Sequence, residues 1–246
     1  MEIAPQFFVY VVESPSDTDF YHRRNEGDAL VQSLRLNGID CVVRCAISHE
    51  AFSAALQIGL KEEIAAHASR LPLLHISCHG NAHGIRLSSG ERVTWDELSS
   101  LLHPINLDLN NRLVVAMSSC EGYSGIRMAM KTDDSPLPFF ALIGSWENPT
   151  WSDTVVAFSA FYHHLQKGRH VRQAVEAMSA ASGCRFAVEW AEDQKDSYRN
   201  FLKTYNPTEA VCALESGKRQ QPETIKSCDR SEAMIIAPIA VFDEAA

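Results

Sequence analysis

A histidine and a cysteine, each at the end of a short apolar run, are the residues of this chain best suited to chemistry. His79 closes the run LLHISCHG and is followed by Gly80, while Cys120 closes the run RLVVAMSSCEG. They lie 120 − 79 = 41 residues apart in the sequence. A thiol and an imidazole brought together are the parts of a cysteine nucleophile and its acid/base partner.

The elements that would position this pair are two buried strands. Each run is short, rich in aliphatic and β-branched residues and bounded by Gly, a pattern typical of fully buried strands. Helical patterns before, between and after the runs favour parallel strands in one α/β sheet. Since ligands of such sheets collect at the carboxyl ends of the strands, His79 and Cys120 are expected at the same edge.

The rest of the chain fits one α/β domain spanning 1–246. Further strands are predicted at 7–13, 41–47 and 139–146, with a hairpin across 85–93. Helices are predicted at 28–37, 49–70, 95–102, 123–131, 153–167 and 170–181, with Ser48, Thr94 and Ser152 as N-caps. Residues 106–111 form a polar connector and 132–138 an exposed loop. The core covers about 7–183, and a C-terminal extension, 184–246, completes or flanks the sheet; its clearest pattern is a strand-like run at 233–242.

Composition excludes several classes of function. The formal net charge of −9 disfavours direct nucleic-acid binding. No basic N-terminal region or long apolar run indicates a signal peptide or a membrane span. Seven cysteines without a CxxC pair indicate a reducing cytoplasm and no zinc ribbon. A metal cluster of His75, Cys78, His79 and His83 is disfavoured because strand alternation splits these residues between two faces of the sheet. We therefore expect no metal. We also expect no cofactor.

Taken singly, a His or a Cys in an apolar strand is usually structural. Here the order of motifs resembles a known family: a strand ending in His79-Gly80, a core strand ending in Cys120, and the stretch ALIGSW…SDTVVAFSAFYHHLQKGRHVRQAVEAM from Ala141 to Met178. These resemble the caspase-like cysteine peptidases, and within them the CHAT branch found largely in bacteria. The resemblance covers about three quarters of the chain and implies a three-layer sandwich, a mostly parallel sheet between helices.

The resemblance also implies an activity. Cys120 would attack a peptide carbonyl, His79 would protonate the leaving amine, and the backbone N–H groups of Gly80 and Cys120 would hold the oxyanion. A protein with these features would make limited cuts in protein substrates. Bacterial relatives resemble regulated switch proteases in stress or antiviral defence, released by a protein activator or sensor subunit.

Substrate-binding candidates lie near the same sheet edge. They are Ser118, Glu121, Trp146, Glu147 and Asp153. Ser118 stands where eukaryotic relatives carry Gln or Asp, so their pocket preference does not transfer. The acids near the edge, which also include Glu13, Asp17 and Asp19, favour a pocket for Arg or Lys, although exposed acids are mostly just solvated. The sequence assigns no third catalytic carboxylate.

Two other functions stay open at this point. A caspase-like domain can serve as a binding module without catalysis, although an intact His-Cys pair disfavours this. An α/β domain can also bind a nucleotide or another small signalling molecule at its strand edge. The absence of a GxGxxG or P-loop string makes that option weaker.

Overall fold

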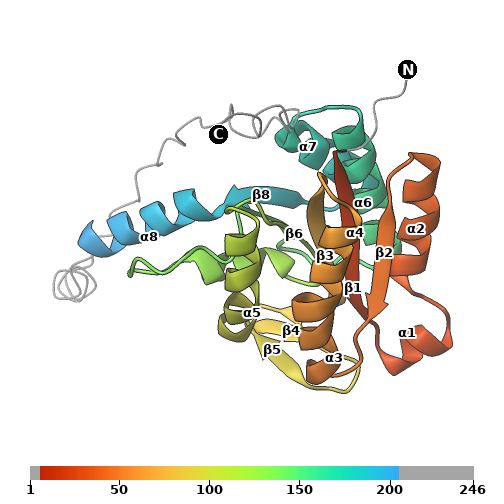
Figure 1. Cartoon of the computed structure of the whole chain (residues 1–246), viewed down its shortest axis with the longest axis horizontal. Helices are drawn as coiled ribbons and strands as arrows, with labels where there is room; N and C mark the ends of the chain where they lie inside the picture. Colours follow the sequence, from red (N-terminus) through yellow and green to blue (C-terminus); the bar gives the residue numbers. More distant parts are fainter. Residues whose placement is uncertain (1–5, 205–246) are drawn as a thin grey trace, which may run out of the picture.

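The chain forms a mostly parallel sheet with helices on both faces (Figure 1). This arrangement comes from a computed structural model that describes residues 6–204. The strand order is β2-β1-β3-β6-β7-β8, and only the last pairing is antiparallel. The bounds are β1 (Phe7–Ser14), β2 (Cys41–Cys45), β3 (Leu71–Asn81), β6 (Val114–Ser118), β7 (Ala141–Ser145) and β8 (Phe186–Trp190). A hairpin of β4 (Gly84–Arg86) and β5 (Arg92–Thr94) extends from the end of β3.

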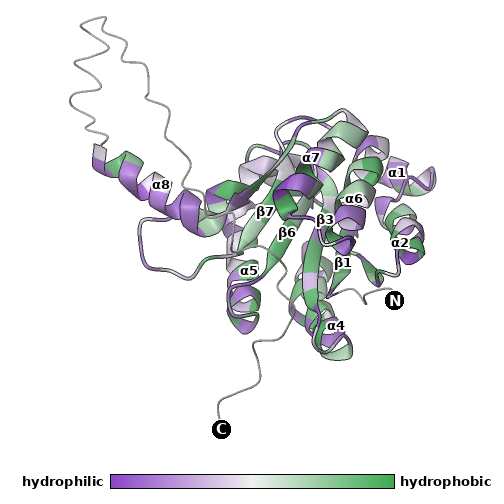
Figure 2. Cartoon of the chain, turned by 90° about the horizontal axis from the view of Figure 1, so that it is seen from above, coloured by the Kyte–Doolittle hydropathy of each residue, from purple (hydrophilic) through white to green (hydrophobic). Residues whose placement is uncertain are grey.

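Two apolar clusters, one on each face of the sheet, make up the core. One face is covered by α2 (Glu26–Leu36), α6 (Trp151–Gln166) and α7 (Val171–Ser182). The other is covered by α3 (His49–Ala54), the π-helical η1 (Ala55–Gly59), α4 (Leu60–Ala66), α5 (Trp95–Asp108) and the 3-10 helix η2 (Gly122–Ala129). Figure 2 shows the hydrophobic strands between the two helical layers. The expected three-layer α/β architecture is confirmed.

Several local expectations are confirmed because the signals that carry them are short-range. The Ser48 side chain caps α3 by accepting a hydrogen bond from Ala51 N. Thr94 and Glu97 form a reciprocal capping box at the start of α5. The antiparallel hairpin of β4 and β5 lies where it was predicted.

Other expectations were wrong at element boundaries. The helix predicted at 49–70 ends at Ala66 and contains a π-helical turn. The helix predicted at 95–102 continues to Asp108, because Asn106 is buried within it and bonds Leu113 N and the Leu137 carbonyl. This residue had been placed in a polar connector.

The start of α6 and the end of the described chain also differ from the expectations. Thr150, not Ser152, caps α6, which begins at Trp151. Phe186–Trp190 forms the edge strand β8, and α8 (Ala191–Thr204) follows it. Neither had been predicted, since β8 is half-buried and α8 is strongly polar. The strand-like run at 233–242 lies outside the described residues.

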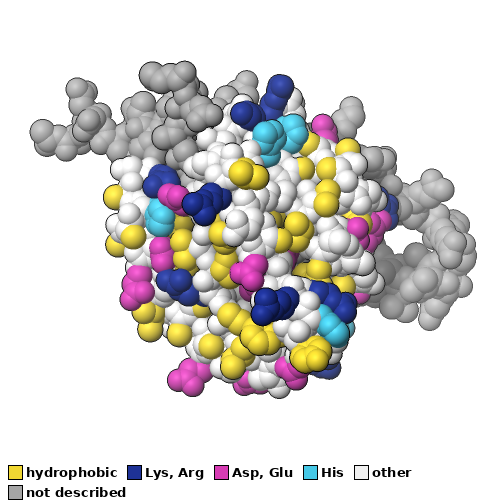
Figure 3. Space-filling view, turned by 90° about the vertical axis from the view of Figure 1, so that its right-hand side faces the viewer, with side chains coloured by type: hydrophobic (Ala, Val, Ile, Leu, Met, Phe, Trp, Pro, Cys, Tyr) yellow, Lys and Arg dark blue, Asp and Glu magenta, His cyan; other side chains and the backbone are white. Residues whose placement is uncertain are grey.

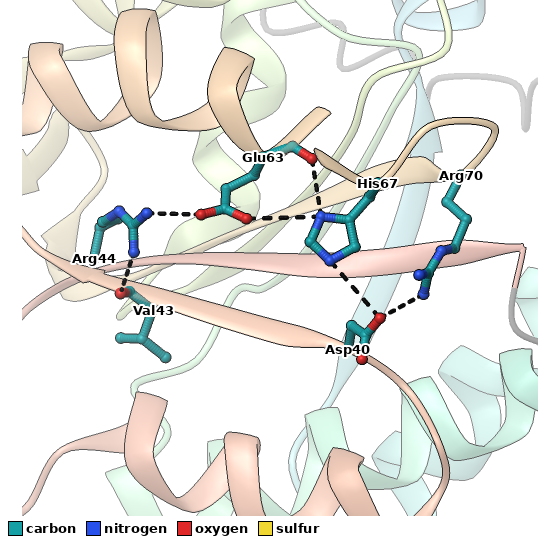
Figure 4. A network of polar contacts seen from close by, with 6 residues as sticks. All are labelled: Asp40, Val43, Arg44, Glu63, His67 and Arg70. Carbon is teal, nitrogen blue, oxygen red and sulfur yellow. Dashed lines mark hydrogen bonds and ion pairs between the residues drawn. The ribbon is translucent and has the colours of Figure 1, made fainter. Parts of the chain in front are cut away.

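A polar network ties the edge strand β2 to α4 and to the start of β3 (Figure 4). Arg44 on β2 pairs with Glu63 at 2.7 Å, and the backbone carbonyl of Glu63 lies 2.9 Å from His67 Nδ1. Asp40, just before β2, accepts a 2.6 Å hydrogen bond from Arg70, just before β3. None of these side chains belongs to the His79 and Cys120 segments, so the network is part of the scaffold.

The outer surface mixes charges of both signs. On the face shown in Figure 3, acidic and basic side chains are scattered between apolar ones rather than gathered by sign. Within residues 6–204, every helix is too short or too polar to cross a bilayer.

Candidate active site

Neighbouring parallel strands bring His79 and Cys120 to one edge of the sheet. Ser77 on β3 is in register with Ser118 on β6, and each site residue lies two positions beyond this pair. A Cβ atom added to Gly80 would lie 2.8 Å from the Cys120 carbonyl oxygen and 3.0 Å from Ser119 Cβ. The His-Gly segment therefore packs directly against the Ser-Cys segment, and only glycine permits this approach without a shift.

Asp19 and Trp151 hold the imidazole of His79. Asp19 Oδ2 lies 3.3 Å from His79 Nε2, and the Trp151 ring contacts the imidazole edge-on with centroids 5.6 Å apart. Asp19 is in α1 (Asp17–Tyr21), which follows β1, while Trp151 begins α6, which follows β7. The end of β3 and the segments that follow β1, β6 and β7 thus supply the site. A carboxylate at this distance can hold the ring in one orientation.

The carboxylate of Asp19 is largely buried and charged. Burial by itself raises the pKa of Asp19, but hydrogen bonds from Ser16 and Trp151 and the charge of the His79 imidazole outweigh it, so the pKa is lowered. Ser16 Oγ donates to Asp19 Oδ2 at 2.5 Å and also caps α1 by accepting from Asp19 N. The acid is therefore fixed in place before any ligand arrives.

The thiol of Cys120 is not activated in this state. Its pKa is raised, first by burial and second by the negative charge of Glu121. Glu121 has a left-handed backbone (φ 51°) and donates its N–H to the Glu147 carbonyl at 2.9 Å, which fixes the turn after the cysteine. Both effects favour the neutral thiol over the thiolate.

Three of the five predicted substrate-binding residues have structural partners instead. Ser118 is fully buried and donates a 2.6 Å hydrogen bond to Glu26. Glu147 accepts two hydrogen bonds from Arg185, at 2.9 and 3.0 Å. Asp153 completes the capping box with Thr150. These contacts hold the three side chains within the fold, and a role for them in substrate binding stays a prediction.

The other two predicted residues remain accessible beside Cys120. Trp146 is 49% exposed and contacts the Tyr123 ring in a tilted arrangement, with ring centroids 4.2 Å apart. Glu121 is half-buried and directly follows the cysteine. The two therefore provide an aromatic wall and a negative charge near the thiol.

A buried polar cluster lies beneath the site and joins β3, β6, α2 and α6. His75 Nδ1 lies 2.9 Å from the Tyr162 hydroxyl, and His75 Nε2 lies 3.5 Å from Glu26 Oε2. Burial by itself raises the pKa of Glu26, but the nearby His75 and the hydrogen bond from Ser118 outweigh it, so the pKa is lowered. Ser77 and Ser118 lie two residues before His79 and Cys120, so this cluster supports both segments of the candidate site from within the core.

Sequence reasoning placed Asp19 only among the acids of a possible pocket, and it did not assign the contacts that Asp19 and Trp151 make with His79 or the contact of Glu26 with Ser118. A weak signal for Asp19 was present, because the spacing Ser16-x-x-Asp19 after a buried strand is typical of a helix cap at the site edge. No comparable signal marks the other two. Within residues 6–204, no three His, Cys, Asp or Glu side chains gather as a metal site, and Cys78 faces the apolar cluster on the side of α5.

Comparison with known proteins shows similarity at the level of structure. No family model and no curated protein matches the sequence. The structure of a secreted C11 cysteine protease from Bacteroides thetaiotaomicron, "iotapain", superposes with a TM-score of 0.56 and 12% identity, covering 85% of this chain and 74% of that one.

Two weaker similarities are to the Arg-specific cysteine proteinase gingipain R and to the complex of the Porphyromonas gingivalis RgpB pro- and mature domains. Their TM-scores are 0.40 and 0.45, both at 11% identity, and they cover 73% and 75% of this chain. The matches span only 44% and 47% of those chains. The comparisons do not single out the CHAT branch. The first similarity, together with the sheet order and the helical layers, shows that this chain has the caspase-like fold of cysteine proteases.

Proposed function

We propose that the protein is a cysteine endopeptidase with Cys120 as nucleophile, His79 as general acid and base, and Asp19 as the residue that positions the imidazole. The observation that carries the proposal is the meeting of a carboxylate-bound imidazole with a cysteine segment at the carboxyl edge of the sheet. The same fold in solved cysteine proteases is consistent with this assignment.

The proposed reaction proceeds through a thioester. The Cys120 thiolate attacks the scissile carbonyl, and the backbone N–H groups of Gly80 and Cys120 are the candidate donors to the oxyanion. The His79 imidazolium gives its proton to the leaving amine as the C–N bond breaks. Neutral His79 then takes a proton from water, which attacks the thioester, releases the acid product and restores the thiol.

The state of the thiol supports regulation of this activity. Burial raises the pKa of Cys120, which favours the neutral thiol over the reactive thiolate. An activating protein, or the substrate itself, would change the surroundings of the cysteine. A role as a switch protease in bacterial stress or antiviral defence rests on the resemblance to CHAT proteins.

The proposed preference for Arg or Lys before the cut bond depends on acidic side chains near Cys120, and fewer of these are available than the sequence suggested. Glu147 and Asp153 are engaged by Arg185 and Thr150, whereas Glu121 stays beside Cys120. A fluorogenic panel with basic, acidic or neutral residues at that position tests the preference. Equal cleavage of the panel, or preference for Asp, would reject it.

The decisive experiment for the activity is labelling with an electrophilic peptide probe followed by mass spectrometry. We expect the label on Cys120 in the wild-type protein, its loss in Cys120→Ala, and strong reduction in His79→Ala. Cys45→Ala is the matched control, since Cys45 is an exposed thiol at the end of β2. Equal labelling of the Cys120→Ala protein would contradict the proposal. Full biological output from that variant would favour the adaptor function.

A further inference from the structure

A row of cationic side chains extends from His79 across the β4–β5 hairpin. In the antiparallel register, His79 is opposite Arg86, and Arg86 is opposite Arg92. Directly opposed residues of antiparallel strands present their side chains on the same face. The alternate row, which contains Ile85 and Val93, is buried in the core, so the three side chains of this cationic row point outward.

The two arginines have no anionic partner among residues 6–204. No hydrogen bond or ion pair joins either guanidinium to the part of the chain that the structure describes. The acids nearest in sequence are engaged elsewhere: Glu91 accepts from Ser89 and His49, and Glu97 accepts from Thr94. Like charges directly opposite one another destabilise a sheet. An acidic protein, with a net charge of −9, thus carries two arginines without an anionic partner in the described residues beside a histidine that is itself paired with Asp19.

This row borders a cleft large enough for peptide side chains. The cleft has a volume of about 370 Å³, and His79, Arg86 and Arg92 are among its lining residues. Its walls come from the end of β3 and from the hairpin. The cationic row is therefore part of a concave surface, unlike an isolated arginine on a convex one.

The row lies on the side of His79 that faces away from Cys120. Ser88, which follows β4, bonds Ser14 and the Pro15 carbonyl at the end of β1, so the hairpin lies on the β1 side of β3. Cys120 follows β6, which pairs with the other edge of β3. During peptide cleavage the acyl part stays on the cysteine, and the amine leaves next to the histidine. The cleft is placed to receive the leaving segment.

We infer that this cleft is a subsite for acidic residues on the leaving-group side of the substrate, with Arg86 and Arg92 as its specificity-determining residues. The inference rests on the proposed peptidase activity and adds to it the chemistry of the released segment. Carboxylates of Asp or Glu match the planar guanidinium groups, which can donate paired hydrogen bonds. Two largely exposed charge pairs, one to each arginine, together increase the affinity for an acidic segment about tenfold over that for a neutral segment.

The test uses internally quenched peptides that share the residues before the cut and carry either Asp-Glu or Asn-Gln after it. We expect the wild-type ratio of kcat/KM for acidic over amide peptide to be about ten at low salt and to fall as salt is added. In the double variant Arg86→Gln/Arg92→Gln the ratio falls to about one. The control Arg35→Gln/Arg169→Gln removes the same charge near the C-terminal ends of α2 and α6, at residues that do not line the cleft, and keeps the wild-type ratio. A wild-type ratio of one, or a high ratio in the Arg86/Arg92 variant, overturns the inference.

A binding measurement without cleavage shows whether the subsite proposal can hold even if the peptidase proposal is wrong. The fluorescein-labelled acidic and amide peptides, and a single-stranded oligonucleotide, are titrated with Cys120→Ala protein and followed by anisotropy. Tighter binding of the acidic peptide that depends on Arg86 and Arg92 supports the subsite even if no peptide is cleaved. Equal binding of the two peptides, or tighter binding of the oligonucleotide, counts against it.

Discussion

Replacing Asp19 with Asn tests whether its carboxylate positions the His79 imidazole for the proposed reaction. Asn keeps the size of the side chain and can still accept the hydrogen bond from Ser16, but it removes the negative charge 3.3 Å from His79 Nε2. The charge matters most when His79 is protonated, which is the form that donates a proton to the leaving amine. We therefore expect the substitution to slow the chemical step and to leave substrate binding largely unchanged.

The expected size follows from the burial of the two side chains. A hydrogen bond to a charged group contributes about 1.5–3 kcal/mol when it is shielded from water. The Asp19 side chain is only 11% exposed, but that of His79 is 38% exposed, so solvent screening reduces the effect. A remaining contribution of about 1–2 kcal/mol corresponds to a loss of about 5- to 30-fold in kcat, with little change in KM.

The assay is steady-state cleavage of a fluorogenic peptide, together with thermal unfolding of each variant. Asp17→Asn is the matched control, because Asp17 lies in the same helical turn and is exposed. We expect this control to cleave like the wild-type protein, and Asp19→Glu to recover part of the activity. If Asp19→Asn keeps kcat within twofold of the wild type while unfolding normally, the positioning role is wrong. A rise in KM alone would also refute the reasoning.

Three further predictions concern the same site. Gly80→Ala places a Cβ 2.8 Å from the Cys120 carbonyl oxygen, so we expect at least about tenfold lower kcat/KM in a folded protein; unchanged cleavage would contradict the close packing. The raised pKa of Cys120 predicts that its alkylation rate, followed by mass spectrometry, still rises above pH 9.0, the ordinary value for a thiol, whereas a plateau near neutral pH would show an activated thiol. Glu26→Gln removes the charge beside buried His75 and should lower the free energy of unfolding by about 3 kcal/mol at pH 7. Since the pKa of Glu26 is lowered by folding, its stabilisation is present above an unfolded pKa of about 4.3 and disappears as pH falls through the folded value. Urea unfolding at neutral and acid pH measures this difference, and an equal loss at both would contradict it.

The sequence predicted those features of the fold that depend on neighbouring residues. Apolar runs bounded by Gly located the strands that carry His79 and Cys120, and cap chemistry located the starts of α3 and α5. The same local signals did not predict the structure at positions where tertiary contacts determine whether a segment is a helix or a strand. Asn106 continues a helix because its amide satisfies backbone groups of Leu113 and Leu137. β8 was missed because only its pairing with β7 makes a strand of a half-buried segment.

By itself, the sequence determined that a thiol and an imidazole end two buried strands, since residue type and apolar periodicity are local properties. Which groups surround them was decided by the tertiary structure. Asp19 reaches His79 across 79 − 19 = 60 residues, and Ser118 reaches Glu26 across 92. Such contacts are set by strand order and register, which bring the ends of β1, β3, β6 and β7 to one edge. The same register aligns Arg86 and Arg92 beside the imidazole, an arrangement that no spacing in the sequence reveals.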